Sequence, residues 1–361
     1  MKRVIVTVTN DLSTDQRVAK VCNTLFNNNF DVLLIGRKLK KSKFLERTYK
    51  TKRFNLYFNT GFLFFAEYNV RLFFFLLFTK KDILLANDLD TLLPNYLIGK
   101  IQRKKVVFDS HELFPEIPEL VNRPKVKKIW LYLEKWMIPK LLNNYTVCDS
   151  IANFYKNNYF SNFETIMNLP TKKEVKKGVF SFETNAKKII LYQGAINIGR
   201  GLENLLETMA FLEHHLLVII GDGDIYNSLK NSISSKNLNN KVVLLGKIAP
   251  KNLHTLTPLA DLGISLEEDL GLNYRFALPN KIFDYIQAEV PVLVSNLPEM
   301  SAIVTSYNVG AVVKNTFPEL LANEIKQVLK KDFTKELKVA KEKLIWEKQE
   351  DKLLAIFNNL R

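Results

Sequence analysis

The 361-residue sequence has only two cysteines, Cys22 and Cys148, which lie far apart in the chain. This spacing excludes a disulfide framework and a paired-cysteine zinc site, so we expect a reducing compartment. Glycine is also scarce, at 13 residues. The first strand runs into residues 11–17 without the glycine-rich fingerprint of dinucleotide-binding enzymes, which disfavours a nicotinamide-dependent enzyme.

Long uninterrupted apolar runs are missing as well. Residues 61–79 are rich in phenylalanine and leucine, but Glu67 and Arg71 interrupt them, and the longest run, 72–78, has seven residues. A membrane span needs about 20. We therefore expect a helix that packs one face on the core, while its aromatics beside Lys80 and Lys81 also suit a membrane interface. The chain starts directly as a strand without a signal-peptide pattern, which favours a cytoplasmic protein.

Acidic residues are few in the first half of the chain. Residues 1–180 hold 31 Lys and Arg against 16 Asp and Glu, whereas residues 181–361 hold 21 of each. A basic field confined to one half predicts an anionic partner for that half, such as nucleic acid, acidic lipid or a phosphorylated acceptor. A solvated, lysine-rich surface is the alternative.

Strands and helices alternate along both halves. Strands are expected at residues 2–9, 31–35, 82–86 and 104–108, and the pattern restarts at 188–192 and continues to 292–294. This alternation predicts an α/β protein with two parallel sheets. Residues 168–170 are expected to link a first domain, 1–167 plus 346–361, to a second domain, 168–345.

Residues 278–295 read as a loop, a helix and a buried strand. Asn280 suits a helix cap, and the start of a helix carries partial positive charge and free N–H groups that can hold a phosphate. Lys281 would add a full charge there, and Asp284, one turn later, suits hydrogen bonds from a ribose. Further upstream, Gly194 begins a loop that enters a helix with Arg200, a cation that can neutralise a diphosphate.

Three other features stand at predicted strand ends, where open α/β sheets bind ligands. His111 follows the strand at 104–108. Gly221 and Gly223 follow the strand at 216–220 and permit close backbone approach. Asp88 and Asp90 match the Asp-x-Asp pattern of metal-dependent enzymes, but we interpret them as caps of the next helix, so no metal site is expected.

The stretches LPNKIFDYIQAEVPVL and NDLSTDQRVAKVCNTL resemble the donor-site signature and the first loop of family-four-like bacterial GT-B glycosyltransferases. The resemblance covers nearly the whole chain. It implies two Rossmann-like domains facing across a cleft, closure on binding, and a final helix that crosses back to the first domain through Leu353, Leu354 and Phe357. It also implies metal-independent sugar transfer with retention, without a cofactor, in cell-surface polysaccharide synthesis.

The resemblance assigns roles to individual residues. Catalysis is expected from His111, beside the donor sugar, and from Arg200 and Lys281. The nucleotide-diphosphate sugar is expected to contact a larger set, namely Gly194, Gly221, Gly223, Lys247, Ile248, Arg275, Asn280 and Asp284. On the acceptor side we expect Asp15, Arg17 and Glu112.

The sequence departs from the family pattern at two positions. Ala195 replaces an expected arginine, for which Lys281 or Arg275 can substitute, and Phe276 replaces an expected glutamate. A donor-binding subunit without catalysis and a sugar-nucleotide epimerase of the same fold therefore stay open as alternatives. The expected partners are a nucleotide sugar, a glycan or lipid-linked acceptor, and the inner face of the cytoplasmic membrane as an anionic surface, with no nucleic acid.

Overall fold

The computed structural model describes residues 1–121 and 123–360. The chain divides into two compact units. Unit 1 comprises Met1–Asn168 and Gln349–Arg361, and unit 2 comprises Leu169–Lys348. These boundaries lie within three residues of the domain limits expected from the sequence.

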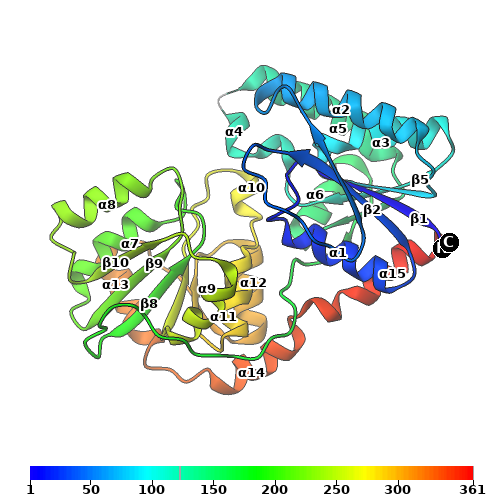
Figure 1. The fold of residues 1–361 in the computed structure, drawn as a ribbon. Helices are drawn as coiled ribbons and strands as arrows, with labels where there is room; N and C mark the ends of the chain where they lie inside the picture. The colour runs from blue at the N-terminus through cyan, green and yellow to red at the C-terminus, as the bar shows by residue number, and fades with distance from the viewer. Residues whose placement is uncertain (122, 361) are drawn as a thin grey trace. The chain divides into compact units, whose positions relative to one another are not determined.

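Unit 1 is built on a parallel sheet in the order β3-β2-β1-β4-β5-β6-β7 (Figure 1). Its central strands are apolar because helices cover both faces of such a sheet. The strands are β1 (Arg3–Thr7), β2 (Asp31–Lys38), β3 (Lys50–Asn55), β4 (Ile83–Asn87), β5 (Lys105–Ser110), β6 (Asn143–Thr146) and β7 (Glu164–Thr165). Strand order reverses between β1 and β4, which is where ligands bind in open α/β sheets.

The helices of unit 1 include the chain's last one. α15 packs on α1, where Thr24 donates a 2.6 Å hydrogen bond to Glu350, and Phe357 meets Phe30, between α1 and β2, edge-on. The expected return of the final helix to the first domain is thus confirmed, with Leu353 and Phe357 buried. The helices are α1 (Gln16–Asn27), α2 (Gly61–Phe78), α3 (Leu89–Ile101), α4 (Pro118–Val121), α5 (Pro124–Met137), α6 (Asp149–Tyr159) and α15 (Glu350–Asn358), with short 3-10 turns at Phe114–Glu116 and Ile138–Lys140.

Unit 2 repeats this design with a parallel sheet in the order β10-β9-β8-β11-β12-β13. Its strands are β8 (Lys188–Gln193), β9 (His215–Ile220), β10 (Val242–Gly246), β11 (Leu262–Ser265), β12 (Val292–Val294) and β13 (Gly310–Val312). Its helices are α7 (Leu202–Thr208), α8 (Tyr226–Ser235), α9 (Pro250–Leu256), α10 (Leu272–Arg275), α11 (Asn280–Gln287), α12 (Pro298–Tyr307), α13 (Pro318–Val328) and α14 (Thr334–Lys343), with 3-10 turns at Met209–Phe211, Thr257–Leu259 and Trp346–Lys348.

The apolar segment at 61–78 forms α2. Tyr68, Leu72 and Leu76 on one side are buried against the sheet, which confirms the expected core-facing side. By length and composition alone, this is the one helix among the described residues that could cross a membrane, and 22% of it is buried.

Candidate functional site

The site in unit 2 lies where β8 and β11 end. Gly194 follows β8, Glu267 lies two residues after β11, and α11 begins at Asn280. Because β8 and β11 are neighbouring parallel strands, their carboxyl ends open on the same edge of the sheet. α11 connects β11 to β12 and runs back antiparallel to them, so its first turn also stands at this edge.

Two predicted cations meet on one carboxylate at this edge. The Lys281 Nζ lies 2.8 Å from Glu267 Oε1, and Arg200 Nη1 lies 3.5 Å from the same oxygen. Lys281 also stands 4.1 Å from the centroid of the Tyr192 ring. The contact of Arg200 is long, and within the described residues its buried Nε has no hydrogen-bond partner. The Arg200 side chain, 28% exposed, is therefore only loosely held by Glu267.

Glu267 is the charged centre of this cluster. Its side chain is fully buried, and burial alone would raise the pKa of a carboxyl. Lys281, a 2.6 Å hydrogen bond from the Ser265 hydroxyl and the charge of Arg200 overcome that effect and lower the pKa of Glu267. Two cations facing one carboxylate leave a net positive charge, to which the start of α11 adds its dipole. An anion such as a diphosphate fits this field.

At the glycines of the site, neighbouring parts of the chain occupy the space that a side chain would need. Gly194 has φ +137°, and a Cβ there would touch the Lys281 side chain at 3.4 Å. A Cβ on Gly221 would lie 1.8 Å from the Gly194 carbonyl oxygen. The close approach that we expected of a ligand at Gly221 and Gly223 is thus made by the loop after β8, where the Ile196 N–H donates a 3.0 Å hydrogen bond to the Asp222 carbonyl.

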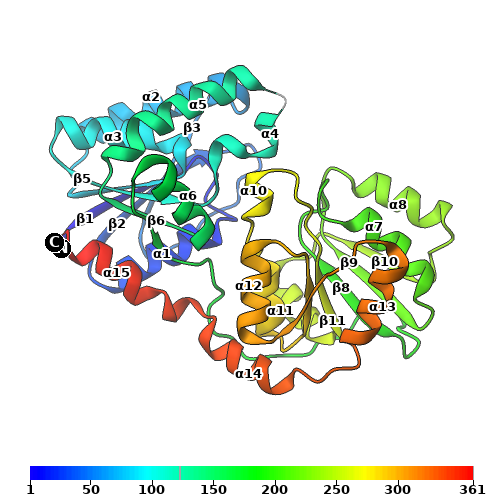
Figure 2. The ribbon, with the colours of Figure 1, turned by 180° about the vertical axis from the view of Figure 1, so that it is seen from behind.

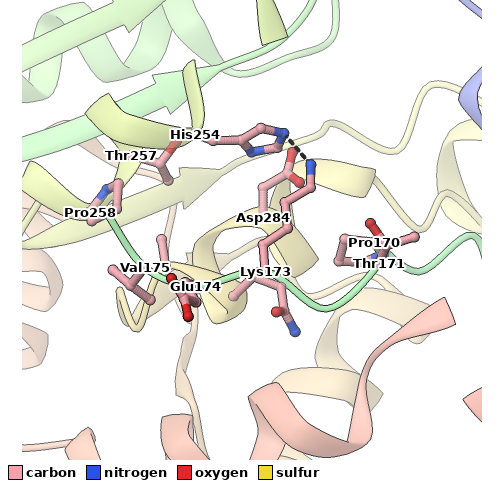
Figure 3. A pocket seen from close by; sticks show the side chains of 11 residues that line it. Pro170, Thr171, Lys173, Glu174, Val175, His254, Thr257, Pro258 and Asp284 are labelled. Atoms are coloured by element: carbon pink, nitrogen blue, oxygen red, sulfur yellow. Dashed lines mark hydrogen bonds between the residues drawn. The ribbon is translucent and has the colours of Figure 1, made fainter. Parts of the chain in front are cut away.

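Asp284 lies one turn along α11, where its carboxylate accepts a 3.2 Å hydrogen bond from Gln193 Nε2. It also lines a pocket beside Lys173, which donates a 2.7 Å hydrogen bond to His254 (Figure 3). Burial, followed by the charge of Lys173, lowers the pKa of His254. The other lining residues are Pro170, Thr171, Glu174, Val175, Thr257, Pro258, Gln287 and Ala288. The Asp284 carboxylate thus stands beside hydrogen-bonding groups, a setting suited to a polar ligand such as a ribose.

Other predicted donor contacts are placed differently. Arg275 forms hydrogen bonds of 2.9 and 2.7 Å with Asp269 at the surface, so of the two substitutes for the missing arginine only Lys281 reaches the Gly194 loop. Asn280 does not cap α11, because Pro279 takes the N-cap position and Asn280 the first helical one. Lys247 and Ile248 follow the edge strand β10, and β9 separates them from β8.

The predicted histidine of unit 1 is held between two carboxylates. His111 Nδ1 lies 3.2 Å from Asp88, and its Nε2 lies 3.0 Å from Asp109. Burial opposes charge on the ring, but the two carboxylates outweigh it and raise the pKa of His111 above its usual value. Asp88 also accepts a 2.8 Å hydrogen bond from the His111 backbone N–H. The arrangement holds a charged imidazole at the carboxyl edge of the first sheet.

Two predicted acceptor contacts are structural. Arg17 is buried in a bidentate pair with Asp109, at 3.0 and 2.8 Å, and donates to the Ile166 carbonyl at 2.8 Å. It therefore cannot reach an acceptor, and it fixes the carboxylate that fixes His111. Asp15 caps α1 by accepting from the Val18 N–H at 3.0 Å. Glu112 stays a candidate and is half-buried near Asp88 and Asp90. Burial, with a smaller contribution from the charge of Glu112, raises the pKa of both carboxyls.

Asp88 and Asp90 do not cap α3 with their side chains, contrary to expectation. Asp88 binds His111, whereas Asp90 accepts a 2.6 Å hydrogen bond from Thr9. Across residues 1–121 and 123–360, no group of three or more His, Cys, Asp or Glu side chains is arranged to hold a metal ion.

Two residues of these sites escaped sequence reasoning. Glu267 is not identified because the resemblance places the expected glutamate at Phe276, although an acid just beyond a buried strand is a signal for such a site. Asp109 closes the predicted strand before His111, but its partner Arg17 is 92 positions away. Local periodicity carries no information about such a pair.

The charge on His111 has a measurable consequence. We expect its ring to stay protonated between about pH 5 and 8. Although burial opposes the charge, the two carboxylates raise the pKa of His111, so this whole pH range lies below that pKa. NMR titration of the imidazole signals tests this, with the His111 signal identified by its loss in His111→Asn. His254 serves as an internal control, because its pKa is lowered. A His111 midpoint near the ordinary value of about 6.5 would contradict the assignment.

Comparison with known proteins adds independent findings. Residues 176–344 match the model of the family "Glycosyl transferases group 1". A search of curated proteins gives no match. Solved structures match over the whole chain. Sucrose-phosphate synthase from Thermosynechococcus elongatus has a TM-score of 0.80 at 15% identity, covering 100% of this chain and 99% of that one.

Two further structures agree. A glycosyltransferase from Rickettsia africae has a TM-score of 0.74 at 15% identity, covering 99% of this chain and 98% of its own. Anabaena HepE in complex with UDP and glucose has a TM-score of 0.74 at 12% identity, covering 99% and 100%. The segment that holds Arg200, Glu267 and Lys281 thus lies within the match to the glycosyl transferases group 1 model, and the chain as a whole has the GT-B fold of these solved structures.

Proposed function

We propose that the protein transfers a sugar from a nucleotide-diphosphate donor to a hydroxyl of a glycan or lipid-linked acceptor. The observation that carries this proposal is the convergence of Lys281 and Arg200 on Glu267 at the start of α11. Cations at a helix start are suited to a diphosphate. The Anabaena structures in complex with UDP and UDP-glucose support a nucleotide sugar as the ligand class.

The reaction exchanges one glycosidic bond for another. The anomeric carbon–oxygen bond to the diphosphate breaks, the acceptor oxygen bonds to the same carbon, and the acceptor proton leaves with the nucleoside diphosphate. Negative charge therefore grows on the departing diphosphate. Lys281 and Arg200 stabilise that charge, and such preorganised stabilisation is usually the largest catalytic contribution. We propose that Asp284 accepts hydrogen bonds from the ribose, that no metal or cofactor takes part, and that configuration is retained.

We assign acceptor recognition to unit 1, around the charged ring of His111. The carboxyl groups of Asp88, Asp90 and Glu112 near this ring suit hydrogen bonds from the hydroxyl groups of a glycan acceptor. That His111 contacts the donor sugar stays a prediction. Two buried free cysteines fit the reducing cytoplasm. A role in cell-surface polysaccharide synthesis would follow from this acceptor class.

The test is incubation with radiolabelled nucleotide sugars, beginning with UDP-glucose, in buffer that contains a chelator. We expect slow hydrolysis without acceptor, faster turnover with a suitable acceptor, and no loss of rate from chelation. NMR of the product then reads the anomeric configuration. Asp284→Ala is expected to weaken donor binding about 10- to 100-fold, at about 1.4 kcal/mol per tenfold change.

Each alternative has its own outcome in this assay. Tight donor binding without turnover for any acceptor would favour a donor-binding subunit. Conversion of one nucleotide sugar into another would favour an epimerase. Loss of activity on chelation would restore Asp88 and Asp90 as candidate metal ligands.

A further inference from the structure

The outward face of α2 is apolar and has no partner within the described residues of the chain. The side facing the sheet buries Tyr68, Leu72 and Leu76. The opposite side exposes large side chains, with Phe62 at 66%, Phe74 at 56% and Phe78 at 83%. Soluble monomers rarely leave such a contiguous apolar face in water, so it indicates an interaction surface.

α5 extends this surface. Figures 1 and 2 both show α2 and α5 beside each other on unit 1, and Phe65 of α2 packs edge-on against Trp130 of α5 at 5.4 Å between ring centroids. The exposed side of α5 carries Ile129 and Tyr132 between lysines. Apolar and cationic side chains therefore alternate along its outer face.

The charge on this region has one sign. Between residues 61 and 140, none of the exposed side chains that the structure describes is Asp or Glu. The exposed cations in the same range are Lys80, Lys100, Arg103, Lys105, Arg123, Lys125, Lys128, Lys135 and Lys140. The acids of the range whose burial the structure describes are buried or half-buried, as Glu134 in α5 is, where Tyr155 and Tyr159 donate hydrogen bonds to it. The surface thus combines aromatic groups with uncompensated positive charge.

We infer that the outer face of α2 and α5 docks on an anionic lipid bilayer. Aromatic side chains enter the headgroup boundary while lysines meet acidic headgroups, and stable attachment of a helix lying in the interface uses both contributions. A nucleic-acid site would need cations beside the aromatic rings, so that phosphates are bound while bases stack on the rings. On α2 the rings form an apolar stripe, and its cation Arg71 is already paired with Glu67 at 2.7 Å. The stripe favours lipid.

The surface reaches the candidate site of unit 1. Asn69 of α2 donates a 2.9 Å hydrogen bond to the Asp90 carbonyl, and Arg37 lies 4.1 Å over the Phe64 ring. The first turns of α2 therefore lie at the carboxyl edge of the sheet, near His111 and Asp88. If the proposed function holds, this placement favours an acceptor that is linked to a lipid in the membrane. The headgroup of that lipid would then be presented at the carboxyl edge of the sheet.

The docking test is co-sedimentation with vesicles of phosphatidylcholine, with and without phosphatidylglycerol, in the absence of donor. We expect binding only with the acidic lipid, weakened by salt. Phe74→Ser/Phe78→Ser and Lys125→Glu/Lys128→Glu should each lower partitioning at least ~10-fold. The matched controls are Phe160→Ser/Phe317→Ser, which changes two exposed phenylalanines elsewhere, and Lys335→Glu/Lys338→Glu on α14. Both should bind as the parent does.

Circular dichroism and thermal melting confirm that each variant is folded. Equal partitioning of the α2, α5 and control variants would overturn the inference. So would a dimer in light scattering that Phe74→Ser/Phe78→Ser dissociates, or RNA binding stronger than vesicle binding that Lys125→Glu/Lys128→Glu abolishes. Since no donor is present, failure here leaves the proposed transfer reaction untouched. Normal docking with equal turnover of soluble and lipid-linked acceptors would overturn the assignment of the acceptor alone.

Discussion

Lys281→Ala is expected to lower kcat about 30- to 150-fold, which corresponds to about 2–3 kcal/mol of lost transition-state stabilisation. The physical reason is that the ammonium beside Gly194 and Glu267 meets the charge that grows on the departing diphosphate. Arg200→Ala should have an effect of the same size. Steady-state kinetics with saturating donor measures both.

Lys281→Ala also leaves the buried Glu267 with one distant cation, so part of a loss in activity could come from instability. Lys281→Ala/Glu267→Gln separates the two effects. Removing the carboxylate charge should restore much of the melting temperature, because no unpaired buried charge remains. It should not restore kcat, because the cation is still missing.

Arg275→Ala is the matched cation control for this experiment. Its side chain is half-exposed and paired with Asp269, and such surface pairs contribute little to stability. We expect its kcat to change less than about threefold. Losses as large as those of Lys281→Ala would place the diphosphate at α10 and remove the assignment to the Glu267 cluster.

Arg17→Met is expected to destabilise the protein by about 3–5 kcal/mol, the largest stability effect that we predict. Its side chain is 4% exposed, and that of Asp109 is fully buried. The substitution keeps the length of the side chain but leaves the Asp109 carboxylate inside the protein with His111 as its remaining cation. Urea unfolding of the full chain, monitored by circular dichroism, measures the difference in free energy of unfolding between the variant and the parent.

The same pair predicts a pH dependence. Burial opposes ionisation of Asp109, but Arg17 and then His111 outweigh it and lower its pKa to about 2. A lowered carboxyl pKa contributes stability above the unfolded value of about 3.9, and this contribution is lost as pH falls toward the folded value. The gap between Arg17→Met and the parent should therefore be constant above about pH 5 and close as pH approaches 2.

Arg3→Met provides the control for Arg17→Met. Arg3 pairs with Asp31 at 2.5 Å, but the two side chains are 31% and 27% exposed, so we expect a loss below about 1 kcal/mol. If both variants lost the same free energy of unfolding, burial would not explain the contribution of the Arg17–Asp109 pair to stability. Arg17→Met/Asp109→Asn should recover part of the loss, because the unpaired charge is gone.

The sequence predicted well those features that repeat along the chain. The buried strands and amphipathic helices follow from periodicity, and β1, β4 and β12 lie where expected. β3 was missed because Lys50–Asn55 is a polar edge strand, buried on neither face. α14 was missed because Thr334–Lys343 is highly charged and buries only Leu337 and Ala340. Segments that bury few side chains have weak hydrophobic periodicity, so their sequence does not indicate the element.

The site shows the same limit. Arg200 and Lys281 were identified from the chemistry of a strand–loop–helix turn, and the fold brings them to one oxygen of Glu267. The Arg17–Asp109 pair depends on tertiary contact, so a residue expected at the acceptor proved to be a buried support. Asn280 was misplaced by one position because Pro279 has the extended conformation of an N-cap.

Isothermal calorimetry with nucleoside mono- and diphosphates tests the central claim most directly. If the Glu267 cluster binds the paired phosphates, the diphosphate of the preferred base should bind the parent at least about 10-fold more tightly than the monophosphate, and Lys281→Ala/Glu267→Gln should abolish that preference. Equal affinities in the parent, or a preference that survives in the double variant, would contradict the account.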